Sequence, residues 1–135
     1  MSTTIDFLTL PDILNIHADQ LANYGGQEGV RDPGLLISAL SQPSMTFGDE
    51  FLHKEIHSMA AAYLFHLVQN HPFVDGNKRV GSVSAIVFLE MNDFELQCDE
   101  DELEDLVFGV ASGKLQKDDV TKFFKMKTVS LLPEA

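Results

Sequence analysis

The stretch that decides the fold is His71-Pro72-Phe73-Val74-Asp75-Gly76-Asn77-Lys78-Arg79, which separates two apolar helical patterns. Before it, in residues 54–70, apolar side chains recur at three- and four-residue spacing, and after it the same spacing runs through residues 77–90. Pro72 interrupts the pattern between the two segments. The stretch therefore predicts a loop held between two apolar helices.

The other segments carry helix signals of their own. Thr9-Leu10-Pro11-Asp12 offers a cap, an early proline and an acidic residue for the helix dipole. Asp32-Pro33 marks the start of another helix. Most segments have helical spacing, so we expect an all-α domain, a compact bundle of about six helices. Besides 54–70 and 77–90, helices are predicted from about Thr9 to Tyr24, Asp32 to Pro43, Asp99 to Gly113 and Asp118 to Lys127, with a short strand at 94–97.

Two segments predict irregular structure. Residues 44–51 contain a glycine and have no helical period, which indicates a surface loop or a short hairpin. Residues 129–135 predict a loosely held C-terminal tail. A chain of 135 residues with 44% hydrophobic content suits one core. Residues 1–128 are therefore expected to form a single domain.

The composition argues against several classes of function. There is no run of about 18 apolar residues, and residues 1–6 lack the basic and apolar regions of a signal peptide. We therefore expect a soluble cytoplasmic protein with no membrane partner. The net charge of −12 would repel a phosphate backbone, so nucleic acid is not an expected partner. Cys98 is the only cysteine, which excludes an intrachain disulfide and a cysteine-based metal site.

The start of the second apolar helix has the chemistry of an anion site. Its first backbone N–H groups have no intrahelical partner, and the helix dipole adds partial positive charge there. Gly76 lets a phosphate approach the backbone, while Lys78 and Arg79 supply full charges. Asp75 offers a hard oxygen ligand for a magnesium ion that also contacts phosphate oxygens. Phosphate binding is the expectation.

His71 completes a set of groups suited to phosphoryl transfer. A neutral imidazole beside a phosphate can take the proton of an incoming hydroxyl as a general base. Phe73 is expected to anchor the loop in the core and so fix its polar neighbours. A structural reading remains for each residue alone: Asp75 or Asn77 as a helix cap, His71 as an ordinary loop histidine, and both cations as an exposed face. That reading does not explain why one loop collects all of them.

Residues 71–79 also resemble the Fic-family motif, His-Pro-Phe-x-Asp/Glu-Gly-Asn-Gly-Arg. They differ from it only at Lys78, where nucleotidyl-transferring members have glycine. Lysine there resembles the Doc branch, the death-on-curing toxins of toxin–antitoxin modules. Tyr24-Gly25-Gly26, residues 29–36 and residues 85–89 are also similar to Doc-like proteins. The resemblance covers nearly the whole chain and implies a Fic-like helical fold.

The resemblance implies an ATP-dependent phosphotransferase. Such an enzyme would use Mg²⁺ and ATP to phosphorylate a Ser or Thr hydroxyl of a protein target, in Doc elongation factor Tu, and so arrest translation. A cognate antitoxin is the implied inhibitor. Gly76 stands where Doc has alanine, so the motif is intermediate between the two branches and an AMP transferase stays open as the alternative enzyme. The alternative from another class is a catalytically silent binding module that uses the groove only to hold a partner. The implied roles are His71 as the base, Asp75 as the magnesium ligand, and Gly76, Asn77, Lys78 and Arg79 as the ATP phosphate-binding group.

Three further features have two interpretations each. Fic proteins have a flap ahead of the motif that aligns the target by strand pairing, and residues 44–51 are either this flap or a simple connector. His53 and His57 are four residues apart and could bind zinc, but an exposed helix face is favoured because structural zinc takes four protein ligands. His17 is interpreted as a packed helix residue rather than a ligand.

Overall fold

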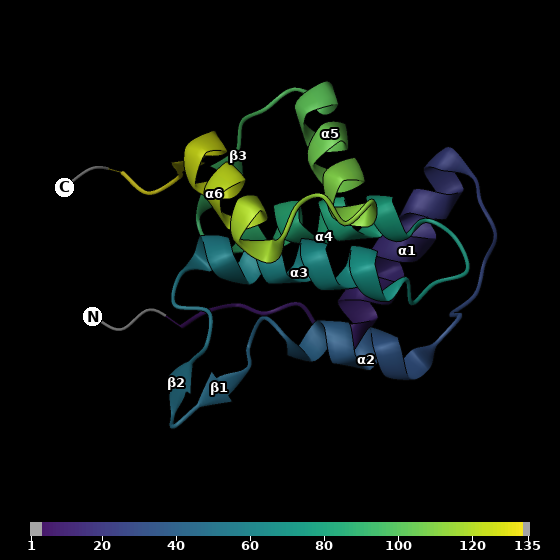
Figure 1. The fold of residues 1–135 in the computed structure, drawn as a ribbon, viewed down its shortest axis with the longest axis horizontal. Coiled ribbons are helices and arrows are strands. Elements are labelled where there is room, and N and C mark those ends of the chain that lie inside the picture. Colours follow the sequence, from purple (N-terminus) through teal and green to yellow (C-terminus); the bar gives the residue numbers. More distant parts are fainter. Residues whose placement is uncertain (1–3, 134–135) are drawn as a thin grey trace.

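The computed structural model describes residues 4–133, and its centre is a pair of helices that run in opposite directions, α3 (Ile56–Asn70) and α4 (Asn77–Met91) (Figure 1). The two helices lie very close together at Gly81 of α4. A Cβ atom at Gly81 would meet Val68 Cγ2 at 2.8 Å and the carbonyl oxygen of Leu64 at 3.2 Å. The pair therefore depends on a residue without a side chain at this crossing.

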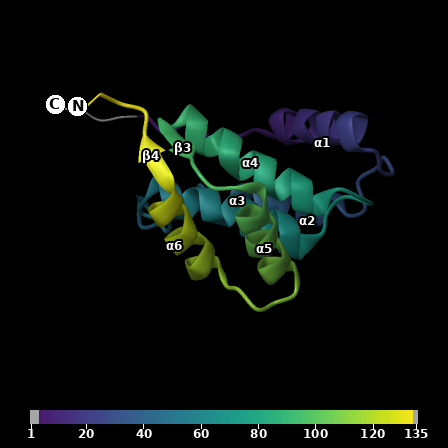
Figure 2. The ribbon, with the colours of Figure 1, turned by 90° about the horizontal axis from the view of Figure 1, so that it is seen from above.

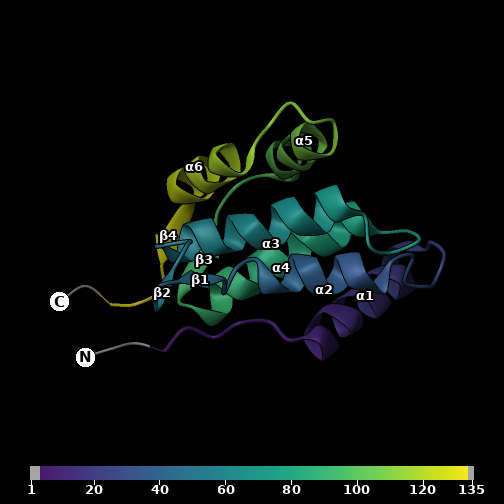
Figure 3. The ribbon, with the colours of Figure 1, turned by 60° about the horizontal axis from the view of Figure 1, so that its bottom comes forward.

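Four further helices cover this pair. α5 (Glu100–Ala111) and α6 (Lys117–Lys127) lie on one side, and Figures 2 and 3 show α1 (Leu10–Tyr24) on the other. α2 (Pro33–Ser41) packs against α3. Six helices thus account for most of residues 4–133, which confirms the all-α prediction. No helix in that range is long and apolar enough to cross a membrane.

The helix starts follow the local signals in the sequence. Thr9 Oγ1 accepts a hydrogen bond from the Asp12 N–H, and the Asp12 carboxylate accepts one from the Thr9 N–H, so the two residues form a reciprocal cap on α1. Asp99 and Glu102 form the same arrangement at the start of α5. These starts need only residues within one turn, which explains why the sequence predicted them.

Short strands complete the fold. β1 (Thr46–Phe47) pairs with β2 (Glu50–Phe51) in an antiparallel hairpin, which is the second of the two predictions for residues 44–51, a surface loop or a short hairpin. β3 (Phe94–Leu96) pairs with β4 (Thr128–Ser130). The hairpin lies at the N-terminal end of α3, at the opposite end of that helix from His71 (Figure 1).

The C-terminal segment differs from its prediction. A loosely held tail was expected from Val129 onward, but Val129 and Ser130 pair with Glu95 and Phe94. The Leu131 N–H also donates to the Asp93 carbonyl at 2.8 Å. The partner strand lies more than thirty residues upstream, so no local pattern announces the pairing. Residues 134–135 of the expected tail lie outside the described residues. Residues 1–3, which belong to the N-terminal segment without signal-peptide features, lie outside them as well.

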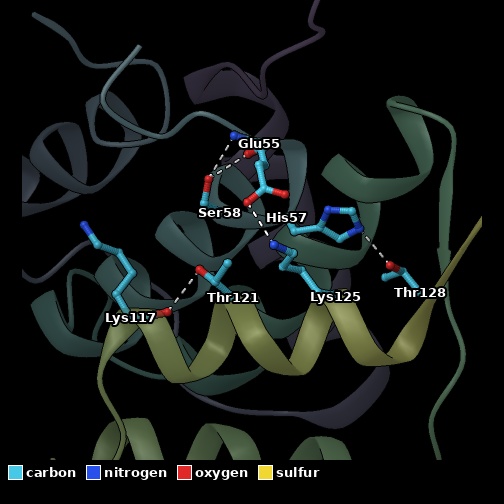
Figure 4. A network of polar contacts seen from close by, with 7 residues as sticks. All are labelled: Glu55, His57, Ser58, Lys117, Thr121, Lys125 and Thr128. Atoms are coloured by element: carbon cyan, nitrogen blue, oxygen red, sulfur yellow. Dashed lines mark hydrogen bonds and ion pairs between the residues drawn. The ribbon is translucent and has the colours of Figure 1, made fainter.

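Polar contacts fasten α6 and β4 to the start of α3 (Figure 4). His57 Nε2 lies 2.9 Å from Thr128 Oγ1, and Lys125 Nζ lies 3.1 Å from the Glu55 carboxylate. The His57 ring also packs on Phe94, and His53 is partly buried as well. The interpretation of His53 and His57 as an exposed helix face is therefore wrong. His57 of α3 is covered by Phe94 and Thr128, and His53 lies before α3, outside the helix, and is half-buried. Within residues 4–133, no three His, Cys, Asp or Glu side chains gather as a metal site.

Candidate active site

The loop between α3 and α4, residues 71–76 and here called the motif loop, turns on two left-handed residues. His71 ends α3 with φ +50° and ψ +52°, and Gly76 precedes α4 with φ +83° and ψ +11°. Glycine adopts this conformation freely, whereas a residue with a Cβ atom adopts it much less often. The conformation of His71 must therefore be held by its surroundings.

The inner side of the motif loop is fastened in the core. The Phe73 side chain has 0% exposure, and its ring stacks on the imidazole of His17, with the ring centroids 3.9 Å apart. Asn77 is also buried, and its side-chain amide spans the loop. Its Oδ1 accepts from the Phe73 N–H at 2.9 Å, and its Nδ2 donates to the Phe73 carbonyl at 3.0 Å. The Asn77 amide is thus occupied by the loop, and what it leaves toward a ligand is its backbone N–H.

The start of α4 has no side-chain cap. Gly76 is the N-cap residue and has no side chain to offer, and the first turn holds no acidic residue. Neither Asp75 nor Asn77 caps the helix, so the structural alternative given for these two residues does not apply. The unpaired N–H groups and the positive end of the dipole face the outside of the motif loop, as an anion site requires.

The carboxylate of Asp75 lies at this helix end and is ionised at neutral pH. Its Oδ2 accepts from the Gln27 N–H at 3.1 Å and its Oδ1 from the Gly76 N–H at 2.9 Å. These two hydrogen bonds, Gln27 first, hold the pKa of Asp75 below its usual value, and the nearby charge of Arg79 acts in the same direction. An exposed, ionised carboxylate with free lone pairs on both oxygens suits Mg²⁺, which commonly takes one or two carboxylates and completes its shell with phosphate oxygens and water.

His17 holds the backbone of the same residue. Its side chain has 7% exposure, and Nε2 lies 2.9 Å from the Asp75 carbonyl oxygen. A carbonyl can only accept, so this nitrogen carries the proton. The interpretation of His17 as a packed helix residue agrees with its burial. Its hydrogen bond to Asp75 spans 58 residues of sequence and could not be anticipated from local spacing.

A second loop, residues 25–32, lies along the motif loop. The N–H groups of Arg31 and Asp32 both donate to the Pro72 carbonyl, at 2.7 and 3.0 Å, and the Val74 N–H donates to the Gly29 carbonyl at 3.0 Å. The hairpin at residues 46–51 lies at the other end of α3 from the motif loop (Figure 1). The flap interpretation required the hairpin to lie beside the motif, so that interpretation is wrong. The segment ahead of the motif that does lie beside it is residues 25–32.

The outward-facing groups of the motif line one cleft of about 440 Å³. His71, Lys78 and Arg79 are exposed to it, and Gln69 of α3 and Ala111 of α5 form its walls. The cleft residues expected from the sequence are His71, Asp75, Gly76, Asn77, Lys78 and Arg79, and the structure brings all six together.

A second hollow of about 670 Å³ begins on the other side of Lys78 and Arg79, between α1, α4 and α5. Tyr24 and Phe108 line it with largely exposed rings, at 65% and 63% exposure. The Arg79 guanidinium lies over the Tyr24 ring, 5.0 Å from its centroid, which steadies a long cationic side chain at the junction of the two hollows. Sequence reasoning assigned no role to Tyr24 in the site.

The chain is similar in sequence to known proteins over most of its length. The model of the Fic/DOC family matches residues 7–89, which include α1 to α4 up to Leu89 and the motif loop. The chain is 36% identical over 117 residues to "Toxin Doc" of Mycolicibacterium smegmatis, a match that covers 85% of this chain and 88% of that protein. It is 29% identical over 109 residues to "Protein kinase doc" of Escherichia phage P1, with coverage of 81% and 85%.

Proposed function

Because the chain belongs to the Fic/DOC family, we propose that it is a Doc-type toxin that transfers the γ-phosphate of ATP to a Ser or Thr hydroxyl of a protein target. One observation carries the proposal: His71, Asp75, Lys78 and Arg79 line a single cleft at the uncapped start of α4. A general base, a metal ligand and a phosphate-binding group are the parts that phosphoryl transfer needs.

The phosphates bind at the start of α4. The free N–H groups of its first turn point toward them, and Lys78 and Arg79 neutralise their charge. Gly76 gives the chain the left-handed turn that exposes these N–H groups. Asp75 would hold Mg²⁺, which would supply positive charge to neutralise the phosphate oxygens. Its own hydrogen bonds from Gln27 and Gly76 keep the carboxylate ionised and fixed in place.

His71 acts on the other reactant. A ring nitrogen of His71 takes the proton of the target hydroxyl as the hydroxyl oxygen forms its bond to the γ-phosphorus. The bond between that phosphorus and the bridging oxygen breaks, and ADP leaves with the negative charge, which Lys78 and Arg79 stabilise. His71 is exposed at the cleft, so a segment of another protein can reach it.

Transfer of phosphate is proposed over transfer of AMP on two grounds. The relative from phage P1 is named a protein kinase. Lys78 also stands where nucleotidyl-transferring members of the family have glycine, and a long cation there changes the room and charge beside the phosphates. Following the family resemblance, the proposed target is elongation factor Tu, the consequence is arrest of translation, and a cognate antitoxin is the proposed inhibitor.

The test is to incubate the purified protein with Mg²⁺ and with ATP labelled at either the α- or the γ-phosphate, in the presence of elongation factor Tu and, separately, a bacterial lysate. Label from the γ-position should appear on a protein band, and His71→Ala should abolish it because the general base is lost. Lys78→Ala should weaken it by about tenfold to a hundredfold, since one phosphate-binding charge is removed. Lys122→Ala removes an exposed lysine outside the cleft and should leave the rate unchanged.

The other outcomes decide between the alternatives. Label from the α-position would establish an AMP transferase and refute the kinase. Label from the γ-position on a lysate protein, but not on elongation factor Tu, would support phosphate transfer and show that the target is a different protein. Absence of transfer from both positions, in both reactions, would favour the silent binding module.

A further inference from the structure

We propose that Arg31, which the sequence analysis assigned no part in the site, is a positioning residue for His71. Its guanidinium binds the peptide carbonyls on either side of the Asn70–His71 junction and so sets the direction in which the His71 imidazole leaves the backbone. The inference rests on the proposed role of His71 as the general base. The claim that Arg31 fixes the direction of the His71 ring can be tested without measuring phosphate transfer.

The contact is made at the end of α3, where the last carbonyl groups of a helix lack intrahelical partners. Arg31 Nε donates to the His71 carbonyl at 2.7 Å, and Nη2 donates to the Asn70 carbonyl at 2.9 Å. The last turn of α3 contains no basic residue of its own. Arg31 therefore supplies, from 40 residues upstream, the cation that complements the negative end of this helix.

His71 needs such a support because its backbone is left-handed, with φ +50°. This conformation is sparsely populated by residues with a Cβ atom and persists where neighbouring groups hold it. The neighbouring groups come largely from one residue, since the backbone N–H of Arg31 also donates to the Pro72 carbonyl at 2.7 Å. Arg31 thus binds three consecutive carbonyls, those of Asn70, His71 and Pro72.

The hydrogen bonds that fix His71 in the described part of the chain reach its backbone rather than its ring. The direction of the imidazole is then determined by the Cα–Cβ bond, which turns with φ and ψ. Loss of the guanidinium frees this backbone to relax toward a common conformation and swings the ring away from the start of α4. The phosphate-binding groups stay in place, because their supports are His17, Gln27 and the Asn77 amide.

The planar fork of arginine is the feature that matters. Two of its N–H groups point in parallel at two consecutive carbonyls, whereas a lysine ammonium in the same place keeps the charge but presents a single point donor. Arg31→Lys should therefore keep part of the positioning of the His71 imidazole, and Arg31→Ala should lose it. This graded response separates positioning from a general effect of charge.

The first test is steady-state kinetics of γ-phosphate transfer in the full-length protein. Arg31→Ala should lower kcat by about tenfold to a hundredfold, the range expected when a catalytic group is misplaced by about an ångström, and should leave the KM for ATP near the wild-type value. Arg31→Lys should fall between the two. Lys122→Ala, which removes an exposed positive charge elsewhere, should match the wild type. A raised KM with an unchanged kcat, or no change at all, would overturn the inference.

The second test is the NMR spectrum of the histidine ring C–H groups, with the His71 signal identified by its loss in His71→Ala. In Arg31→Ala this signal should move and broaden, while those of His57 and His66 should stay. A His71 signal that does not move would refute the positioning role whatever the kinetics show. If the signal moves and the wild-type protein transfers no phosphate, the proposed function fails and the positioning stands. Where Arg31→Ala does not fold, as shown by urea unfolding, Arg31→Lys carries both tests.

Discussion

At the C-terminal end of α3 the motif loop is held by polar contacts from three other parts of the chain. At the N-terminal end the hairpin of β1 and β2 is held by its own strand pairing and by the Phe51 ring, which packs on Phe7. His17, Arg31 and Asn77 all hydrogen bond to the motif loop or its flank. In the hairpin, Phe47 pairs with Glu50 and its side chain has 81% exposure. The comparison indicates that the exposed polar groups of the motif loop are positioned by long-range hydrogen bonds, while the tip of the hairpin is shaped by its own strand pairing.

The largest expected difference between the two turns comes from truncating a phenylalanine in each. Phe73→Ala should lower the free energy of unfolding by about 3–5 kcal/mol, because the side chain is fully buried and stacks on His17. Phe47→Ala should change it by less than about 0.5 kcal/mol, since that ring is exposed. Urea unfolding measures both. Equal losses would break the comparison, because the hairpin would then be as firmly anchored as the motif loop.

A smaller loss of unfolding free energy should follow from removing the Asn77 side-chain amide, which spans the motif loop. Asn77→Ala leaves the buried N–H and carbonyl of Phe73 without partners and should cost about 2–3 kcal/mol of unfolding free energy. Asn23→Ala is the matched control, because Asn23 is exposed and its amide bonds only to Asp19 within α1. Its cost should be less than about 0.5 kcal/mol. A loss in Asn77→Ala no larger than in the control would show that the loop keeps its shape without the amide.

The smallest expected effect is a pH dependence of stability that comes from the middle of α3 and not from the motif loop. His66 lies there beside Lys117 of α6, with Nε2 and Nζ 3.1 Å apart. Burial, and then the charge of Lys117, lower the pKa of His66 to about 4 from 6.5. Between pH 6.5 and pH 4 the unfolded chain therefore binds a proton that the folded chain does not, so this contribution to stability is lost as the pH falls.

The change to test is His66→Gln, with urea unfolding at pH 7 and pH 5. The wild type should lose stability between these values, and the variant should lose less, although the lowered pKa values of His53 and His57 leave part of the slope. His71→Ala in the motif loop leaves the His66–Lys117 contact untouched and should keep the wild-type loss from His66. If His66→Gln lost as much unfolding free energy between pH 7 and pH 5 as the wild type, groups other than His66 would cause the acid sensitivity.

Most of the helices could be predicted because their signals are local. The reciprocal caps of Thr9 with Asp12 and of Asp99 with Glu102 each span three residues. The candidate site was equally accessible to sequence reasoning, because its outward-facing groups are consecutive, from His71 to Arg79, and their chemistry is suited to phosphate. Residues that are close together in the sequence were therefore sufficient to predict both the helix starts and the groups of the candidate site.

The features that the sequence did not reveal all join distant parts of the chain. Strand β4 pairs with β3, and the same C-terminal region covers His57, which sequence reasoning had placed on an exposed face. The hairpin was predicted as an element, but its position at the far end of α3 from His71 was not. Periodicity reports which side of a segment is apolar; it does not report what covers that side.

The sequence by itself determined an all-α fold, the loop between two apolar helices, and the set of groups that this loop presents, because each depends on residues within a few turns of one another. Only the tertiary structure decided how that set is held: by His17 at Asp75, by Gln27 at the Asp75 carboxylate, and by Arg31 at the end of α3. These contacts span 40 to 58 residues. The physical reason is that a hydrogen bond depends on distance and direction in space, and chain segments so far apart in sequence acquire a mutual distance and direction only when the core between them has packed.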